Sequence, residues 1–246
     1  MRLYNEIIHD ILTSLEKQDK HILPVGAAAD PVSRDWQDAG KAMMILQPDM
    51  AYELGGHNLP AVGNTLVTTE EGFVAGDEIV LIGKDLPDIA EDTPYARIAL
   101  VRVAEDSIGT GDQLYNTIQN IGYFRYHIYP KGFMLRVSSS NDRESVRVEA
   151  EALNEGLNFT AIGNAMLRAL HLHKEVEAVR IIFITDPKVD YGRLQDGLKK
   201  TKQITATIDH MLKDVNMDCG SCGLQEICDE IEGLREMHFG MSEEHT

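Results

Sequence analysis

Short β-type apolar runs alternate with helical patterns along the middle of this chain, and this alternation is the feature that most constrains its fold. The β-type runs lie at residues 79–82, 98–103, 133–137 and 179–185. Each run is short and rich in Val, Ile, Leu or Phe, as buried strands are. Helical patterns lie at 114–121, 159–172 and 188–212. This mixture predicts a layered α/β or α+β fold, a mixed sheet with helices on its faces.

The N-terminal part of the chain has a different character. Apolar residues recur at helical three-and-four spacing from residue 2 to about 19, which predicts an amphipathic helix. The stretch 23–60 is rich in Gly, Ala, Asp and Pro, with a possible short helix at 36–46. We therefore expect three parts, which are an N-terminal helical arm (1–50), a central α/β domain (51–212) and a small C-terminal cysteine segment (213–246).

The charge balance argues against two classes of partner. The chain has 23 Lys and Arg against 40 Asp and Glu, a formal net charge of -17 at pH 7. Such a surface repels phosphate backbones and anionic lipids, so we expect no nucleic acid and no membrane partner. Charges interrupt each apolar run near the N-terminus, and no later run approaches the roughly 20 apolar residues of a membrane span. We expect a cytoplasmic protein.

All three cysteines lie close together near the C-terminus. Cys219, Cys222 and Cys228 have C-x2-C-x5-C spacing, and His238 follows them. A glycine comes directly after each of the first two cysteines and favours a tight turn, which would bring both sulfurs to one side of a metal. Three Cys and one His satisfy a tetrahedral zinc ion, whereas an iron-sulfur cluster needs about four thiolate-type ligands. The residues alone leave both possibilities open.

Acidic residues surround this cysteine segment and bear on the choice of metal. They are Asp218, Glu226, Asp229, Glu230, Glu232 and Glu236. Their charge is expected to raise the pKa of the thiols and to disfavour a further anionic cluster, whereas it would help a zinc ion. A third possibility is that the thiols hold no metal and that the acidic surface of a scaffold protein docks a partner.

Four segments of the chain together resemble a known family. They are Tyr52–Gly56 (YELGG), Glu78–Leu86 (EIVLIGKDL), Met134–Ser138 (MLRVS) and Phe183–Asp186 (FITD). Similar segments occur in this order and at similar distances in the acetyl-CoA synthase subunit of the CO dehydrogenase/acetyl-CoA synthase complex. The resemblance covers about residues 50–228. It implies a truncated relative that keeps the central domain and the start of the cluster-binding domain.

The family resemblance extends to the cysteines. Cys219 and Cys222 match the first pair of the family's cluster ligands, and Cys228 is similar to the third. His238 stands where the family's fourth Cys would be. The resemblance thus implies an iron-sulfur cluster (4Fe-4S), with zinc as the alternative metal. The family's later Cys-Gly-Cys nickel-binding motif has no counterpart before Thr246, so we expect no nickel.

The resemblance also limits the expected activity. In the family, paired arginines and a Trp lie in the region thought to meet coenzyme A, where this chain has Asn116, Thr117 and Met134. Groups suited to bidentate phosphate recognition are therefore missing. We expect a transferase-like subunit of an anaerobic system that is not active alone. Its partners would be other subunits of a CO dehydrogenase/acetyl-CoA synthase or corrinoid system, or a second copy of itself. The alternative is a non-catalytic scaffold or a zinc-stabilised interaction protein.

Overall fold

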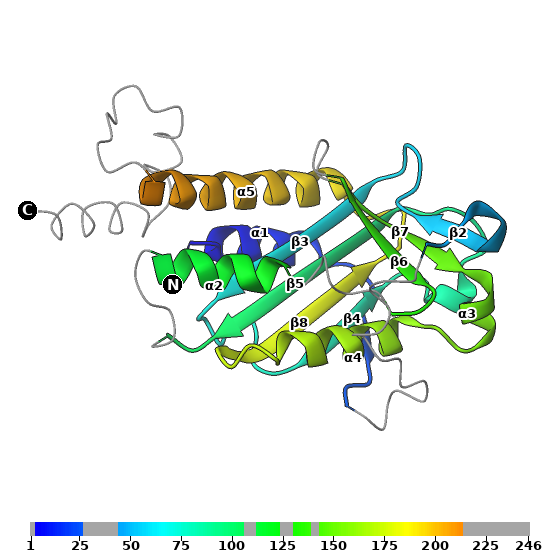
Figure 1. Cartoon of the computed structure of the whole chain (residues 1–246), viewed down its shortest axis with the longest axis horizontal. Coiled ribbons are helices and arrows are strands. Elements are labelled where there is room, and N and C mark those ends of the chain that lie inside the picture. The colour runs from blue at the N-terminus through cyan, green and yellow to red at the C-terminus, as the bar shows by residue number, and fades with distance from the viewer. Residues whose placement is uncertain (1–2, 27–43, 106–111, 124–129, 139–142, 214–246) are drawn as a thin grey trace, which may run out of the picture.

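The computed structural model describes residues 3–26, 44–105, 112–123, 130–138 and 143–213. Two sheets form its framework (Figure 1). The larger sheet has the strand order β1-β4-β8-β5-β3 and the smaller has the order β2-β7-β6. The larger sheet comprises β1 (His21–Leu23), β3 (Ala61–Thr68), β4 (Glu78–Ile82), β5 (Tyr95–Val103) and β8 (Val176–Ile184). The smaller comprises β2 (Met50–Leu54), β6 (Phe133–Ser138) and β7 (Arg143–Glu149).

The larger sheet is mixed. Strands β4 and β8 pair in parallel, as do β3 and β5, whereas β5 and β8 pair antiparallel. The short strand β1 pairs antiparallel with β4 and forms one edge of the sheet, and β3 forms the other. Both pairings in the smaller sheet are antiparallel. The expected mixed sheet with helices on its faces is therefore confirmed.

Helices cover both faces of the larger sheet. They are α1 (Asn5–Ser14), α2 (Asp112–Tyr123), α3 (Ala150–Asn154), α4 (Phe159–Leu170) and α5 (Tyr191–Lys213), with 3-10 turns η3 (Gln47–Asp49) and η4 (Leu86–Asp88). Asn64 of β3 bonds to α5, whereas Ile79 of β4 packs against Gly163 of α4. Strand register puts these two residues on opposite faces of the sheet, because successive side chains alternate. Helices α1 and α5 therefore lie on one face and α4 on the other.

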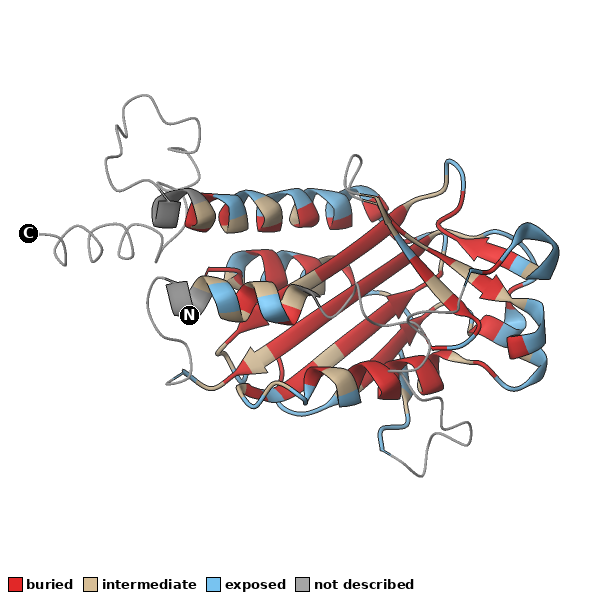
Figure 2. Ribbon diagram, in the orientation of Figure 1, coloured by how far each residue is buried: buried red, intermediate tan, exposed pale blue. Residues whose placement is uncertain are grey.

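The core is continuous through these layers, as the buried interior in Figure 2 shows. Phe159, the first residue of α4, lies where the two sheets meet. Its ring stacks on Phe183 of β8 at 4.5 Å and on Tyr95 of β5 at 6.5 Å, and it meets Phe133 of β6 edge-on at 6.4 Å. Aromatic pairs at these distances stabilise a core beyond their buried area. Phe159 thus joins the larger sheet to the smaller one.

Several elements differ from the sequence prediction. The first helix is shorter than expected, because it begins at Asn5 and ends at Ser14. Of the possible helix at 36–46, residues 44–46 are not helical and the rest lies outside the described residues. Strands β1, β2, β3 and β7 were not expected. The division of the chain at residues 50 and 212 stays a prediction. Among the helices that the structure describes, none has the length and apolar character needed to cross a membrane.

Candidate functional site

The four predicted metal ligands are outside the described residues. Cys219, Cys222, Cys228 and His238 all belong to the segment 214–246. Helix α5 leads into this segment, since it ends at Lys213. Within the described ranges, no group of three or more His, Cys, Asp or Glu side chains is arranged to hold a metal ion.

The YELGG segment forms an ionic junction inside the smaller sheet. Glu53 of β2 accepts hydrogen bonds from Arg147 at 2.6 Å and from Arg136 at 3.1 Å through the same oxygen, Oε1. The Glu53 side chain is only 9% exposed, so both arginines compensate a nearly buried charge. Arg147 also donates to the carbonyl oxygen of Ile45 at 3.1 Å. The motif's glutamate therefore ties all three strands of this sheet together.

Neighbouring atoms leave no room for a side chain at either glycine of the YELGG segment. Gly55 has a φ of +66°, and a Cβ there would run into Ala61. A Cβ on Gly56 would meet the carboxylate of Glu53. Arg143 holds this turn from the other side, with hydrogen bonds to the carbonyl oxygens of Gly55 and Leu59 at 2.8 and 2.7 Å. These contacts give the family-like ELGG sequence a structural role.

A buried ion pair links the two sheets. Arg97 of β5 donates to Glu144 of β7 twice, from Nε at 2.6 Å and from Nη2 at 2.8 Å. The two side chains are 0% and 2% exposed. Arg97 Nη1 also donates to Thr65 Oγ1 at 3.3 Å. Gly63 of β3 leaves the space that the carboxylate of Glu144 occupies, because a Cβ there would overlap it. The position of Glu144 thus depends on a glycine in the other sheet.

Tyr95 lies next to this pair and has an unusual environment. Its ring is fully buried, and its hydroxyl has no hydrogen-bond partner among the described residues. Burial raises the pKa of Tyr95 above its usual range, and the nearby charge of Glu144 raises it further, against the opposing effect of Arg97. Tyr95 is therefore a neutral phenol at any ordinary pH. A buried hydroxyl without a partner costs stability.

The loops after β4 and β8 meet at one end of the larger sheet. Asp85 accepts backbone hydrogen bonds from Leu86 at 2.7 Å and from Phe159 at 2.8 Å, so it joins η4 to the start of α4. Burial raises the pKa of the Asp85 carboxyl despite these two bonds. Thr185 donates to the carbonyl oxygen of Lys84 at 2.8 Å. The IGKD and ITD segments, which carry part of the family resemblance, are therefore in direct contact.

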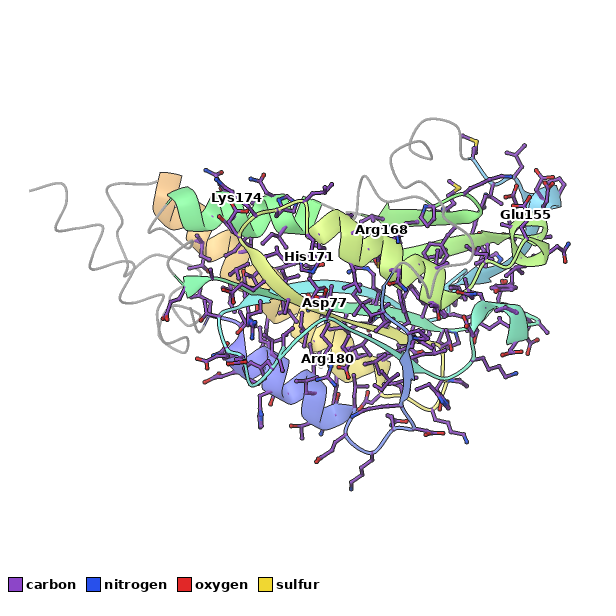
Figure 3. The ribbon with its side chains drawn as sticks, turned by 90° about the horizontal axis from the view of Figure 1, so that it is seen from below. Asp77, Glu155, Arg168, His171, Lys174 and Arg180 are labelled. Atoms are coloured by element: carbon purple, nitrogen blue, oxygen red, sulfur yellow. The ribbon has the colours of Figure 1, made fainter. Side chains whose placement is uncertain are left out.

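The helical pattern at 159–172 includes His171, and His173 comes directly after it. Helix α4 instead ends at Leu170, so both histidines follow it. The Nε2 atom of His171 lies 3.0 and 2.9 Å from the two carboxylate oxygens of Asp77. Figure 3 labels both residues. Asp77 Oδ1 also accepts from the backbone nitrogen of Val179 at 2.9 Å. The histidine therefore docks the end of α4 onto the sheet.

The residues at the family's coenzyme A positions are separated in this structure. Asn116 is an exposed residue of α2, and Thr117 follows it. Met134 belongs to β6 of the smaller sheet, where its sulfur accepts a hydrogen bond from the backbone nitrogen of Ile45 at 3.3 Å. The three side chains supply no cation. Asn, Thr and Met side chains are uncharged and cannot bind a phosphate in the bidentate way that an arginine can.

A comparison with protein families gives one match. Residues 38–189 match the family described as CO dehydrogenase/acetyl-CoA synthase complex beta subunit. A search of curated proteins finds no relative that matches the chain. The family match covers more than half of the chain. It includes the smaller sheet, the larger sheet except β1, the ELGG turn and the loops at Asp85 and Thr185. The chain therefore belongs to the CO dehydrogenase/acetyl-CoA synthase complex beta-subunit family.

Proposed function

We propose that this protein is an acetyl-CoA-synthase-like subunit that binds an iron-sulfur cluster through Cys219, Cys222 and Cys228. The observation that carries the proposal is the family match over residues 38–189, followed along the chain by a C-x2-C-x5-C segment. Thiolates at this spacing are typical cluster ligands. His238, or a residue of a partner subunit, supplies the fourth ligand.

The proposal does not include a nickel centre in this sequence. The chain has only three cysteines, and all three belong to the C-x2-C-x5-C segment. No Cys-Gly-Cys motif occurs among them. We infer that the chain acts with other subunits of a complex rather than alone, which agrees with the family's description as one subunit of a complex.

Metal analysis on anaerobically purified protein tests this proposal. We expect iron and sulfide in the protein and a broad absorption band near roughly 400 nm, as iron-sulfur clusters give. Cys222→Ala should lose the band, because it removes one of the two closely spaced thiolates. Ser221→Ala is the matched control, since it changes the neighbouring residue without removing a sulfur. Iron-free protein after anaerobic reconstitution would reject the proposal.

Zinc is the alternative, and one observation favours it. Six acidic residues surround the cysteines, and their field stabilises a divalent cation more than an anionic cluster. In that case the protein is a non-catalytic interaction module whose C-terminal segment is ordered by zinc. Purified protein would then contain zinc without sulfide, and a chelator would lower its stability. The same metal analysis therefore separates the two functions.

A further inference from the structure

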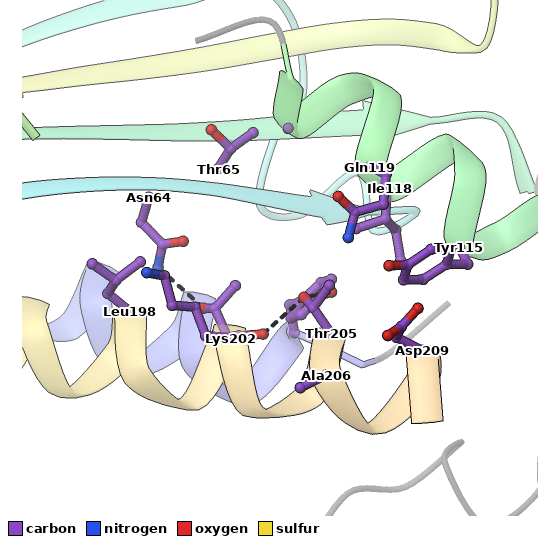
Figure 4. Close-up of a pocket in the computed structure, with 13 residues that line it drawn as sticks. Asn64, Thr65, Tyr115, Ile118, Gln119, Leu198, Lys202, Thr205, Ala206 and Asp209 are labelled. Carbon is purple, nitrogen blue, oxygen red and sulfur yellow. Dashed lines mark hydrogen bonds between the residues drawn. The ribbon is translucent and has the colours of Figure 1, made fainter. Parts of the chain in front are cut away.

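A polar pocket lies beside the edge strand β3. It has a volume of about 310 Å³ and is lined by Tyr4, which comes directly before α1, and by residues of β3, α2 and α5. Figure 4 shows how α2 and α5 face each other across it. Its polar lining residues include Asn64 and Thr65 of β3, Gln119 of α2, and Thr201, Lys202 and Asp209 of α5. This volume is at the lower end of the range for small-molecule sites.

The hydroxyl groups on the α5 side of the pocket have already used their hydrogens. Thr201 donates to the carbonyl oxygen of Gly197 at 2.9 Å, and Thr205 donates to the carbonyl oxygen of Thr201 at 2.9 Å. The Tyr4 hydroxyl lies 3.1 Å from Thr205 Oγ1 and therefore acts as the donor to it. Asn64 Nδ2 donates to Thr201 Oγ1 at 3.1 Å. These groups are thus rigidly held and present few free donors.

The amide oxygen of Asn64 and the side-chain amide of Gln119 remain available to bind a ligand. Asn64 is only 1% exposed and lies between Val62 and Leu66, which are both fully buried. In Figure 4 its amide nitrogen is turned toward α5, where the bond to Thr201 is drawn. Within the described part of the chain, no hydrogen bond uses the amide oxygen of Asn64 or the side chain of Gln119. The amide oxygen of Asn64 is therefore an acceptor that a ligand's N–H group can use.

The backbone of β3 adds a donor and an acceptor at the same place. Among the described strands, β3 pairs only with β5, so its other side is an open sheet edge. The N–H and C=O groups of successive residues point alternately to the two sides of a strand. One of the two consecutive residues Asn64 and Thr65 therefore directs both groups away from β5, toward the pocket. This paired arrangement of donor and acceptor is complementary to an amide group.

The charges around the pocket are balanced. Lys202 and Asp209 contribute one cation and one anion from the same helix. No arginine is among the described residues that line the pocket. A phosphate-rich ligand needs several cationic or bidentate donors, so this pocket does not suit one. An uncharged ligand does not need such donors.

We propose that this pocket binds a small uncharged molecule that carries amide groups, through Asn64, Gln119 and the open edge of β3. The buried amide oxygen accepts from a ligand N–H, and Gln119 provides both a donor and an acceptor. The ligand's second amide face pairs with the free backbone groups of the strand. No cysteine is among the described residues that line the pocket, and the test below does not depend on the proposed cluster.

The test is an NMR titration of the ¹⁵N-labelled full chain with N-acetylglycine N-methylamide, a neutral diamide. We expect saturable shifts of the Asn64, Thr65 and Gln119 signals at millimolar probe. Inorganic phosphate is expected to cause no saturable shift of these signals. Absence of a saturable response to the diamide, or an equal response to phosphate, would overturn the proposal.

Variants locate the binding. Ala206→Trp introduces a large side chain into the pocket from an exposed position of α5 and should abolish the response. Gln203→Trp is its matched control, because Gln203 is also exposed on α5 but does not line the pocket. Gln119→Met keeps the side-chain length and should weaken binding about tenfold, as loss of one or two neutral hydrogen bonds does. If Ala206→Trp still binds the diamide, the site is elsewhere.

Discussion

Replacing Glu144 by Gln should destabilise the protein strongly, because it removes the carboxylate that accepts two hydrogen bonds from the buried charge of Arg97. Arg97 is fully buried, and its two bonds to Glu144 are 2.6 and 2.8 Å long. Removal of one partner of such a pair costs about 3–5 kcal/mol. Domains of this size are stable by about 5–15 kcal/mol, so the loss is a large fraction of the total. Gln fits the space beside Gly63, which isolates the effect of charge.

Urea unfolding followed by circular dichroism measures this loss. Asp196→Asn is the matched control, because Asp196 pairs with Lys199 at 3.2 Å on the surface, where both side chains are more than two-thirds exposed. That change should cost less than about 0.5 kcal/mol. If Glu144→Gln leaves no folded protein, the double variant Arg97→Met with Glu144→Gln is measured instead. It also removes the buried charge of Arg97 and should recover folding. A loss below about 1 kcal/mol for Glu144→Gln, or no recovery in the double variant, would refute the reasoning.

Three further predictions concern the core and can be checked by the same unfolding measurement. Tyr95→Phe should raise the free energy of unfolding by about 1 kcal/mol, because it removes a buried hydroxyl that has no partner among the described residues. Tyr4→Phe should instead lower the free energy of unfolding by about 1 kcal/mol, because it breaks the hydrogen bond to Thr205. Equal effects of the two changes would contradict this prediction. Gly63→Ala should cost about 1–3 kcal/mol, since the new methyl group overlaps the carboxylate of Glu144, and a neutral result would mean that the carboxylate moves freely. Burial raises the pKa of Asp85, so its ionisation opposes folding and stability falls as the pH rises from the unfolded-state pKa through the folded-state pKa. Asp85→Asn should remove this dependence, and a difference between wild type and variant that stays constant with pH would count against it.

The α/β class and the positions of several elements follow from local patterns. The run at 79–82 lies within β4, and the helical pattern at 114–121 lies within α2. Both are recognisable because their periodicity is uninterrupted and depends only on near neighbours. The cysteine spacing is also a purely local property, and the structure adds only that α5 leads toward it.

Strand β3 was missed because its pattern is interrupted. Gly63 and Asn64, which are of residue types depleted in strands, occupy its middle beside Thr65. The structure explains each of them by a partner elsewhere. Gly63 makes room for Glu144, Asn64 bonds to α5 and Thr65 accepts from Arg97. A signal was available in Arg97, a single charge within an otherwise apolar part of a strand, which indicates a buried counter-ion.

What the sequence by itself determined is therefore the class of fold, the approximate positions of several regular elements and the cysteine motif that suggests a metal. All three depend on residues close together along the chain. The pairing of Arg97 with Glu144, the cradle at Gly63 and the pocket beside β3 were decided only by the tertiary structure. Their partners are far apart in sequence, and which side chains meet depends on strand register and on how the two sheets pack, which no local pattern encodes.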